Sequence, residues 1–409
     1  MRKQVVTVLI ALLPWATGVV GCGQPLPVNE DPTTIAEQLA RNQADIEEEL
    51  AQRAYAEARA ASAQFFGVSE QQLTAGEALV PTDLRQRAAS VLMVGVRNYD
   101  DALFALSQGA GGIFIGSWTD PGLLTTPGRD IAALRASVGR PFSVSIDAEG
   151  GRVQRQPALF GAVPAPREMA SSHTSEQAEA MAFELGTRLR GAGVTVDFAP
   201  VLDLDGGRGA GAIGDRSFSA DPAVAAEYGA AFARGLSRAG VRPVYKHFPG
   251  HGRARGDSHF QSVTGPNLTD VKAVDLAPYG PALATSDGAV MVGHVQVPGL
   301  GDASPSSINP AAYQLLRSGD YPGGTPYRGV IYTDDLSGMK AISARMSTPE
   351  AVVASLTAGA DVALWISTAE LGAAINAVER AVVAGSYSGQ QLHNSALRAK
   401  LQLVVHEQQ

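Results

Sequence analysis

Short apolar runs alternate with longer helical stretches from about residue 84 to the end of the chain. The runs are four to six residues long and mostly apolar along their whole length, which is typical of strands buried on both faces of a parallel sheet. The pattern therefore predicts eight buried strands. They cover residues 91–96, 112–116, 142–146, 194–199, 243–246, 289–293, 330–333 and 361–366.

Helical segments lie between most of these predicted strands, and two of them are long. Ser175–Arg190 and Asp221–Ala239 are rich in alanine and other helix-forming residues. Eight strand-and-helix units over roughly 300 residues fit an α/β fold of the (β/α)8 TIM-barrel type, which typically needs about 250 residues. The alternative is an open doubly wound sheet, but no Gly-rich dinucleotide fingerprint follows any of the strands. We therefore predict a barrel.

The first residues have the pattern of an export signal. Arg2 and Lys3 precede an apolar run, Val5–Val20, which is shorter than the roughly 20 residues that span a bilayer. The run ends at Gly21 and Cys22, and Cys22 is the single cysteine of the chain. A signal that ends at a cysteine resembles a bacterial lipoprotein signal, in which Cys22 is lipidated and becomes the new N-terminus. The alternative is an ordinary secretory signal with a chance cysteine.

Residues 22–83 are predicted to form a tether followed by an N-terminal helical extension. Asp31-Pro32 has the residue types of a helix start, and the segment from there to about Ser62 is rich in Ala, Glu, Gln and Arg. We interpret it as a packing helix with a solvated acidic face, and a partner-binding helix is the alternative. The domain prediction is thus a signal peptide (1–21), this extension and a barrel domain (84–409). The apolar residues with helical spacing are Ile35, Leu39, Ile46 and Leu50.

Composition and charge exclude one class of partner. The 409 residues are 45% hydrophobic and 18% charged, as expected for a folded, enzyme-sized protein. The net charge is −8, and no basic stripe offsets it, so nucleic-acid binding is not expected.

Lys246–Gly252 and the nearby Asp257-Ser258-His259 concentrate three of the seven histidines of the chain. Proline lacks an N–H and glycine is entropically costly in a helix, so the sequence of Lys246–Gly252 excludes a regular helix. We predict a loop that presents polar side chains, which is where binding and catalytic groups commonly lie.

Polar side chains also follow most of the other predicted strands. The carboxyl ends of barrel strands meet at one face, so these side chains are expected to form one site for a polar ligand. They are Asp147, Glu149 and Arg155 after the third strand, Asp197, Asp203 and Arg216 after the fourth, Lys246 and His247 at the fifth, His294 after the sixth, and Asp334 and Asp335 after the seventh.

Two kinds of chemistry fit this site poorly. His247 and His251 are four residues apart, but the intervening proline and glycine remove the helix that would align them on a metal, and Lys246 would repel a cation. We therefore expect no metal and no other cofactor. Nucleophilic acyl transfer needs a serine or cysteine beside a histidine, and the chain has no G-x-S-x-G elbow.

Glycosyl transfer fits better, because cleavage of an acetal needs a carboxylate on one side of the sugar ring and a proton donor on the other. Asp334, at the end of a strand, is the candidate nucleophile. Asp257 and His259 could form a hydrogen-bonded pair in which the carboxylate orients the imidazole. Charge-assisted hydrogen bonds to ring hydroxyls would come from five further residues. These are Asp147, Arg155, Arg216, Lys246 and His247.

These residues lie within motifs that resemble those of the family 3 glycoside hydrolases, in particular the bacterial β-N-acetylglucosaminidases that act on peptidoglycan fragments. The resemblance covers about residues 84–370. Its motifs are DAEGGRVQR (147–155), VDFAPVLDL (196–204), IGDRSF (213–218), KHFPGHG (246–252), DSH (257–259) and VIYTDDLSGM (330–339).

The resemblance implies a retaining hydrolysis. Asp334 would be the nucleophile, His259 with Asp257 the general acid/base, and the five residues named above the sugar contacts. The substrate would be a fragment with terminal β-linked N-acetylglucosamine next to N-acetylmuramic acid, and we expect a monomer anchored through Cys22 at the outer face of the cytoplasmic membrane.

Three alternatives remain: a phosphorylase, because a neutral imidazole does not repel phosphate; a β-glucosidase; and a non-catalytic sugar-binding lipoprotein. For individual residues a structural role is also open. His251, Asp203 and Asp335 could hold loops, Asp197 could cap a strand end, and His294 could either line the site or pack beneath it.

Overall fold

The computed structural model describes residues 32–206, 212–254 and 263–407. It divides into two compact units, Met1–Arg59 and Ala60–Gln409, which are considered separately below. The predicted signal peptide, Cys22, and the predicted acid/base pair Asp257 and His259 lie outside the described residues.

One long helix, α1 (Pro32–Phe66), provides the described part of the first unit and continues into the second. It confirms the helix predicted for the extension. Glu47, Glu48 and Glu49 are exposed, as predicted for an acidic face. Ile46 and Leu50 are exposed as well, so these two apolar side chains find no packing partner within the described part of their unit.

The second unit is built on a parallel eight-stranded barrel. Each strand pairs in parallel with its neighbour, and a parallel bridge between Tyr332 and Val362 joins the two ends of the sheet. All eight predicted strands are confirmed, with ends that differ by a few residues. In sheet order they are β11 (Ile331–Thr333), β9 (Ala289–Val292), β7 (Arg242–Phe248), β6 (Val196–Asp197), β3 (Ser143–Ile146), β2 (Gly112–Ile115), β1 (Leu92–Val96) and β12 (Ala363–Trp365).

The loop predicted for Lys246–Gly252 begins later than expected, because the strand predicted to end at Lys246 continues through His247 to Phe248. Lys246, His247 and Phe248 belong to β7, and the turn begins only at Pro249. Val244, Tyr245 and Phe248 are apolar, and the chain remains in the sheet as far as Phe248. The strand ends there because Pro249 has no N–H to donate to the next ladder hydrogen bond. As a result, strand backbone positions Lys246 and His247.

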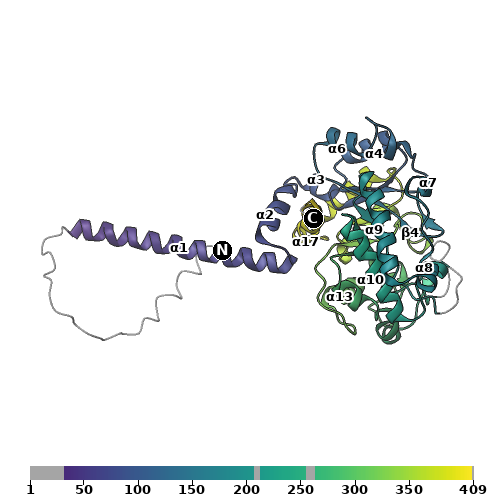
Figure 1. The fold of residues 1–409 in the computed structure, drawn as a ribbon. Helices are drawn as coiled ribbons and strands as arrows, with labels where there is room; N and C mark the ends of the chain where they lie inside the picture. The colour runs from purple at the N-terminus through teal and green to yellow at the C-terminus, as the bar shows by residue number, and fades with distance from the viewer. Residues whose placement is uncertain (1–31, 207–211, 255–262, 408–409) are drawn as a thin grey trace. The chain divides into compact units, whose positions relative to one another are not determined.

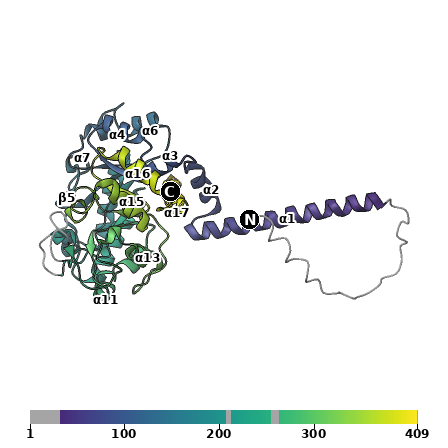
Figure 2. The ribbon, with the colours of Figure 1, turned by 180° about the vertical axis from the view of Figure 1, so that it is seen from behind.

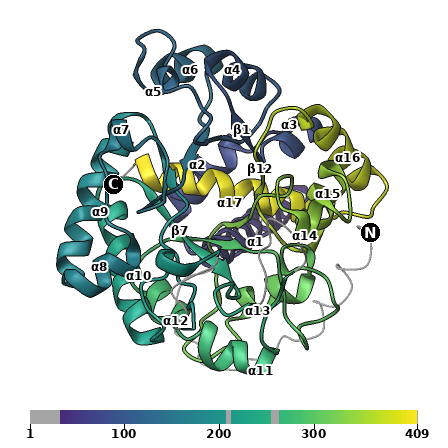
Figure 3. The ribbon, with the colours of Figure 1, turned by 90° about the vertical axis from the view of Figure 1, so that its right-hand side faces the viewer.

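Helices surround the strands (Figure 3). The two long predicted helices are confirmed as α9 and α10, and Thr174 and Asp221 cap their N-termini. These helices cover one side of the barrel (Figure 1), and α15 and α16 cover the opposite side (Figure 2). The α-helices after α1 are α2 (Glu70–Leu79), α3 (Leu84–Ala89), α4 (Tyr99–Ser107), α5 (Gly122–Thr125), α6 (Ile131–Val138), α7 (Pro157–Phe160), α8 (Pro166–Ser172), α9 (Ser175–Gly191), α10 (Pro222–Arg238), α11 (Leu268–Asp270), α12 (Tyr279–Ala284), α13 (Pro310–Ser318), α14 (Lys340–Ser343), α15 (Thr348–Ala358), α16 (Leu371–Val383) and α17 (Gly389–Glu407).

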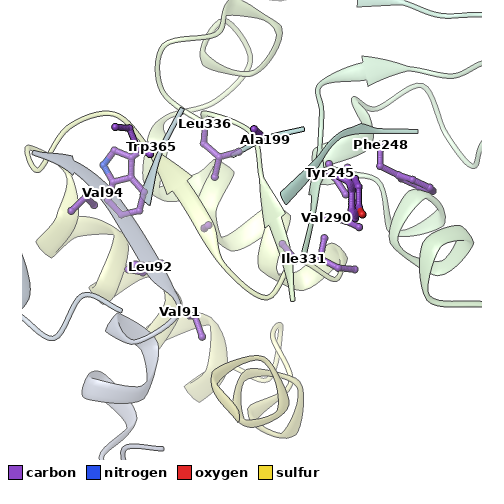
Figure 4. Packing of buried hydrophobic residues seen from close by; sticks show 14 of the residues in the cluster. Val91, Leu92, Val94, Ala199, Tyr245, Phe248, Val290, Ile331, Leu336 and Trp365 are labelled. Atoms are coloured by element: carbon purple, nitrogen blue, oxygen red, sulfur yellow. The ribbon is translucent and has the colours of Figure 1, made fainter. Parts of the chain in front are cut away.

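The core has two parts because successive strand residues point to opposite faces. Leu92 and Val94 face the helices, as Figure 4 shows, whereas Met93 between them faces the barrel interior. The interior cluster fills the barrel with side chains from seven strands or their immediate flanks: Met93, Phe114, Val196, Phe198, Val244, Ala289, Met291, Val330, Tyr332, Val362 and Leu364.

The C-terminal helix α17 closes the amino-terminal end of the barrel. The side-chain amide of Gln402 donates to the hydroxyl of Tyr332, 2.8 Å away. A cavity of about 360 Å³ opens at the same end, beside Arg242, Ala289 and Val330. Both features lie at the starts of the strands, away from the polar residues at their carboxyl ends. Within the described ranges, no helix is both long and apolar enough to cross a bilayer.

Candidate active site

The carboxyl ends of the strands bring most of the predicted site residues together. Asp147 directly follows β3, Lys246 and His247 lie in β7, and Asp334 directly follows β11. Arg216 comes from a single 3-10 turn, η1 (Gly214–Arg216), downstream of β6. The prediction that strand ends build one polar site is therefore confirmed.

An ion-pair network centred on Glu149 organises one half of this site. The Lys246 ammonium lies 2.6 Å from Glu149 Oε1 and 2.8 Å from Asp147 Oδ1. The Arg216 guanidinium binds Glu149 through two hydrogen bonds, each 2.7 Å long. Arg155 completes the network at 3.4 Å from Asp147 Oδ2. The other four residues of the network were all predicted as sugar contacts, and Glu149 links two of them, Arg216 and Lys246.

The charges in this network stabilise one another. Burial alone would raise the pKa of Glu149, but the positive charges of Arg216 and Lys246 hold it below its usual range. Burial opposes the charged form of Lys246 as well, yet Asp147 and Glu149 raise its pKa above the ordinary value. Both groups are therefore ionised at neutral pH. Asp147 and Arg155 keep part of their side chains exposed, 16% and 28%, and are accessible to a ligand.

Asp203 holds the second predicted group in place. Its Oδ2 lies 2.5 Å from His247 Nδ1, and its Oδ1 accepts a hydrogen bond from the backbone N–H of His251 at 2.6 Å. Burial raises the pKa of Asp203, but the interactions with His247 and His251 lower it further than burial raises it. The structural role considered for Asp203 is confirmed, since it fixes the His247 ring and the turn after β7.

Asp334 is a buried carboxylate that directly follows β11. Its Oδ1 accepts a hydrogen bond from the backbone N–H of Asp335 at 2.8 Å. Burial raises the pKa of Asp334, whereas Coulomb interactions with His247 and His294, the Asp335 N–H and the charge of Lys246 lower it, to about 2. An ionised carboxylate held at a strand end has the properties of a nucleophile.

The neighbouring Asp335 has the structural role that was considered for it. Its carboxylate accepts hydrogen bonds from the backbone N–H and the hydroxyl of Ser337 and from the N–H of Gly338, each at 2.9 Å. These bonds shape the turn that follows Asp334. The Asp335 carboxylate therefore binds groups of its own loop.

His294 packs beneath the site. Its ring is buried, with Nε2 2.8 Å from the carbonyl oxygen of Asp335 and Nδ1 2.7 Å from the hydroxyl of Ser307. A carbonyl oxygen can only accept, so Nε2 carries a proton and donates it to Asp335, whereas the Ser307 hydroxyl can either donate to Nδ1 or accept from it. Both ring nitrogens are thus occupied by the protein.

Asp197, at the end of β6, differs from the other carboxylates. Burial raises its pKa to about 8, although the N–H of Ala148, which donates at 2.9 Å, and the charge of Lys246 act in the opposite direction. Its Oδ2 has no partner among the described residues. The raised pKa favours the neutral acid at pH 7, and the Asp197 side chain ties the end of β6 to Ala148 after β3.

The segment that carries the predicted acid/base pair is flanked by two fixed points. On its amino-terminal side, the Arg253 guanidinium binds the buried Asp275 carboxylate at 2.7 Å. On its carboxyl side, β8 (Val263–Thr264) pairs with β10 (Val295–Gln296). The geometry of Asp257 and His259 themselves lies outside the described residues.

Sequence reasoning placed Glu149 among the polar residues at the strand ends but gave it no role, and it considered only a structural role for Asp203. The available signal was local: Glu149 directly precedes Gly150, in a segment with Arg152 and Arg155, and stands three residues after the end of a predicted strand. Its partners are 67 and 97 residues further along the chain, so spacing could not identify them. Within the described ranges, no group of three or more His, Cys, Asp or Glu side chains is arranged to hold a metal ion.

Comparison with known proteins agrees with this geometry. The sequence model of the glycosyl hydrolase family 3 N-terminal domain matches residues 84–401. The chain therefore belongs to glycoside hydrolase family 3, and it is a glycoside hydrolase.

Two curated relatives illustrate the similarity. The chain is 45% identical over 317 residues to the β-hexosaminidase LpqI of Mycobacterium tuberculosis, a match that covers 77% of this chain and 81% of the relative. It is 35% identical over 255 residues to a β-hexosaminidase of Stenotrophomonas maltophilia, which covers 61% of this chain and 74% of the relative.

Solved structures share the fold. A family 3 glycosyl hydrolase of Mycobacterium smegmatis is 46% identical, with a TM-score of 0.77, over 79% of this chain and 98% of its own. The M. tuberculosis LpqI structure is 44% identical, with a TM-score of 0.75, over 79% of this chain and 93% of its own. A β-N-acetylglucosaminidase from Paenibacillus sp. is 30% identical, with a TM-score of 0.73, over 80% of this chain and 64% of its own.

Proposed function

We propose that this protein is a retaining exo-β-N-acetylglucosaminidase that removes terminal β-linked N-acetylglucosamine from peptidoglycan fragments. The observation that carries the proposal is the buried Asp334 carboxylate directly after β11, whose pKa is lowered to about 2 although burial raises it. The names of the relatives, β-hexosaminidase and β-N-acetylglucosaminidase, support the same activity.

The proposed reaction has two steps. In the first, an Asp334 oxygen attacks the anomeric carbon, the glycosidic C–O bond breaks, and His259 gives its proton to the leaving oxygen. In the second, His259 takes a proton from water, the water oxygen attacks the anomeric carbon, and the bond to Asp334 breaks. Asp257 orients the imidazole of His259 in both steps. The product is N-acetylglucosamine with its original anomeric configuration.

The site residues supply binding in this scheme. Asp147 and Arg155 keep accessible surface beside Lys246 and can exchange hydrogen bonds with ring hydroxyls. Because Glu149 and Asp203 hold Lys246, Arg216 and His247 in fixed positions, the site is preorganised and loses little side-chain entropy when a sugar binds.

Chromogenic substrates test the activity directly. Purified enzyme is expected to release p-nitrophenol from the β-N-acetylglucosaminide much faster than from the β-glucoside, and Asp334→Ala should abolish release while the fold is retained. Turnover that is equal on both substrates would favour a β-glucosidase, and unchanged turnover in Asp334→Ala would refute the assigned nucleophile.

Added phosphate distinguishes hydrolysis from phosphorolysis. A hydrolase shows the same rate with and without phosphate and yields free N-acetylglucosamine. If phosphate accelerates turnover and the product is N-acetylglucosamine 1-phosphate, the second step uses phosphate in place of water.

The proposed location rests on the N-terminal sequence alone. Lipidation at Cys22 would anchor the enzyme at the outer face of the cytoplasmic membrane, where fragments that contain N-acetylglucosamine and N-acetylmuramic acid are accessible. The test is phase separation in a detergent of the full-length protein expressed in a bacterium. The wild type should enter the detergent phase, and Cys22→Ala should remain aqueous; an aqueous wild type would refute the anchor.

A further inference from the structure

Trp118 is a large aromatic side chain that remains 42% exposed at the catalytic end of the barrel. It lies in the loop that follows β2. Ile115 at the end of β2 is in register with Ile146 at the end of β3, so Gly116 is the strand-end neighbour of Asp147. Adjacent parallel strands are about 4.8 Å apart. The Trp118 loop therefore starts directly beside a predicted sugar-binding carboxylate.

The indole ring lies against the backbone of Gly116. A Cβ atom on Gly116 would come within 2.5 Å of three carbon atoms of the six-membered part of the indole, so a larger residue could not occupy this position without displacing the ring. The ring centroid is also 6.0 Å from that of Phe114, which belongs to the cluster inside the barrel. Trp118 thus covers the barrel interior beside β2, at the carboxyl ends of the strands.

Hydrogen bonds hold the loop in this conformation. Thr119 Oγ1 accepts from the N–H of Gly116 at 3.0 Å and donates to the carbonyl of Val96 at 2.6 Å. The side-chain amide of Gln156, next to Arg155, donates to the carbonyl of Thr119 at 2.9 Å. The loop is therefore fixed to both β1 and the segment that carries Arg155, and the indole is preorganised.

We propose that the exposed face of Trp118 is the aromatic platform on which the terminal sugar of the substrate stacks. The proposal rests on the proposed function. A pyranose ring with equatorial substituents presents axial C–H groups on its faces, and such an apolar face suits an aromatic plane, while its hydroxyls reach Asp147 and Arg155.

The position of Trp118 also defines which end of the sugar it contacts. β2 is separated from β11 by β1 and β12 on one side of the barrel and by β3, β6, β7 and β9 on the other. Trp118 therefore lies across the site from Asp334, at the sugar edge remote from the bond that breaks. Contacts far from the reacting atoms are similar in the ground and transition states, so they lower KM and leave kcat nearly unchanged.

Intrinsic fluorescence tests the contact without requiring turnover. The chain contains Trp15, Trp118 and Trp365, and Trp365 is only 1% exposed. Titration with N-acetylglucosamine should change the emission of the wild type and of the matched control Trp365→Phe, whereas Trp118→Phe should lose the change. A saturable change that persists in Trp118→Phe would overturn the proposal.

Kinetics give a second, independent test. Trp118→Ala should raise KM for p-nitrophenyl β-N-acetylglucosaminide by about 10-fold, the size of one aromatic contact, with kcat within about 3-fold of the wild type. Trp118→Phe should recover part of the loss. Gly116→Ala, which displaces the indole but keeps it in the chain, should raise KM in the same way. A fall in kcat at constant KM in these variants would contradict a binding platform.

The two proposals fail differently. If the wild type binds N-acetylglucosamine through Trp118 but turns over no N-acetylglucosaminide, the platform stands and the proposed function is wrong. If the wild type is active and Trp118→Ala leaves both KM and the fluorescence titration unchanged, the function stands and the platform is wrong.

Discussion

Replacement of Glu149 by glutamine is the sharpest test of how this site is held together. The side chain has no exposed surface, and it forms one 2.6 Å contact with Lys246 and two 2.7 Å hydrogen bonds with Arg216. Glu149→Gln keeps the shape but removes the negative charge that pairs directly with both Lys246 and Arg216. Removal of one partner from a buried ion pair typically costs 3–5 kcal/mol.

We expect Glu149→Gln to reduce the free energy of unfolding by about 3–5 kcal/mol, which corresponds to a fall in Tm of roughly 5 °C for a domain of this size. The matched control is Asp215→Asn. Asp215 also pairs with an arginine, Arg152, at 2.6 Å, but the two side chains are 44% and 48% exposed. Exposed pairs contribute about 0–1 kcal/mol, so the control should lose less than 1 kcal/mol. Denaturant unfolding of the three proteins, followed by tryptophan fluorescence, measures both differences.

The pH dependence supplies a further check. Because the folded protein holds the pKa of Glu149 below its usual range, the stability from this group is present above about pH 4.3 and is lost as the pH falls towards the folded pKa. The difference between wild type and Glu149→Gln should therefore narrow below about pH 4. A loss in Glu149→Gln no larger than in Asp215→Asn, or a difference that does not change with acidification, would refute the role assigned to this network.

Three other substitutions have defined outcomes. Asp334→Asn should lower kcat on p-nitrophenyl β-N-acetylglucosaminide by at least ~10³-fold with an unchanged circular-dichroism spectrum; residual activity above that level would exclude Asp334 as the nucleophile. Burial raises the pKa of Asp197 to about 8, so the folded protein holds a proton that the unfolded chain releases above about pH 4. The contribution of Asp197 to the free energy of unfolding therefore falls as the pH rises from about 4 to 8. Asp197→Asn should remove that decline, and denaturant unfolding at pH 5 and pH 8 would contradict the assignment if the two proteins lost stability in parallel. Gly252→Ala should cost about 1–3 kcal/mol, because a Cβ would meet the carbonyl oxygen of Leu204 at 2.2 Å, whereas Gly372→Ala, with no neighbour within 4 Å in α16, should cause no loss in Tm.

The barrel itself could be predicted because its signal is local. Each buried strand is a short apolar run, and each long helix has a start signal such as Thr174 or Asp221 directly before it. The exact strand ends could not be predicted. β7 extends to Phe248, beyond the predicted end, because pairing with β9 continues to Val292, and that pairing depends on a strand more than forty residues away.

The candidate site could be predicted only as a set of residues at strand ends. The sequence places Asp147, Lys246 and Asp334 at the carboxyl ends of three strands, and parallel strands carry such residues to the same face. It could not reveal that Glu149 joins Lys246 to Arg216, because an ion pair forms between groups that are close in space and distant in the chain.

The sequence by itself determined the fold class, the strand order along the chain and the residue types available for glycoside chemistry, since periodicity and composition are properties of short segments. The tertiary structure alone decided which carboxylates are ionised. Asp197 and Asp334 both end a strand and are both buried, yet the pKa of Asp197 is raised to about 8 and that of Asp334 is lowered to about 2. The difference arises because desolvation dominates at Asp197, whereas His247, His294 and Lys246 lie close enough to Asp334 to outweigh it.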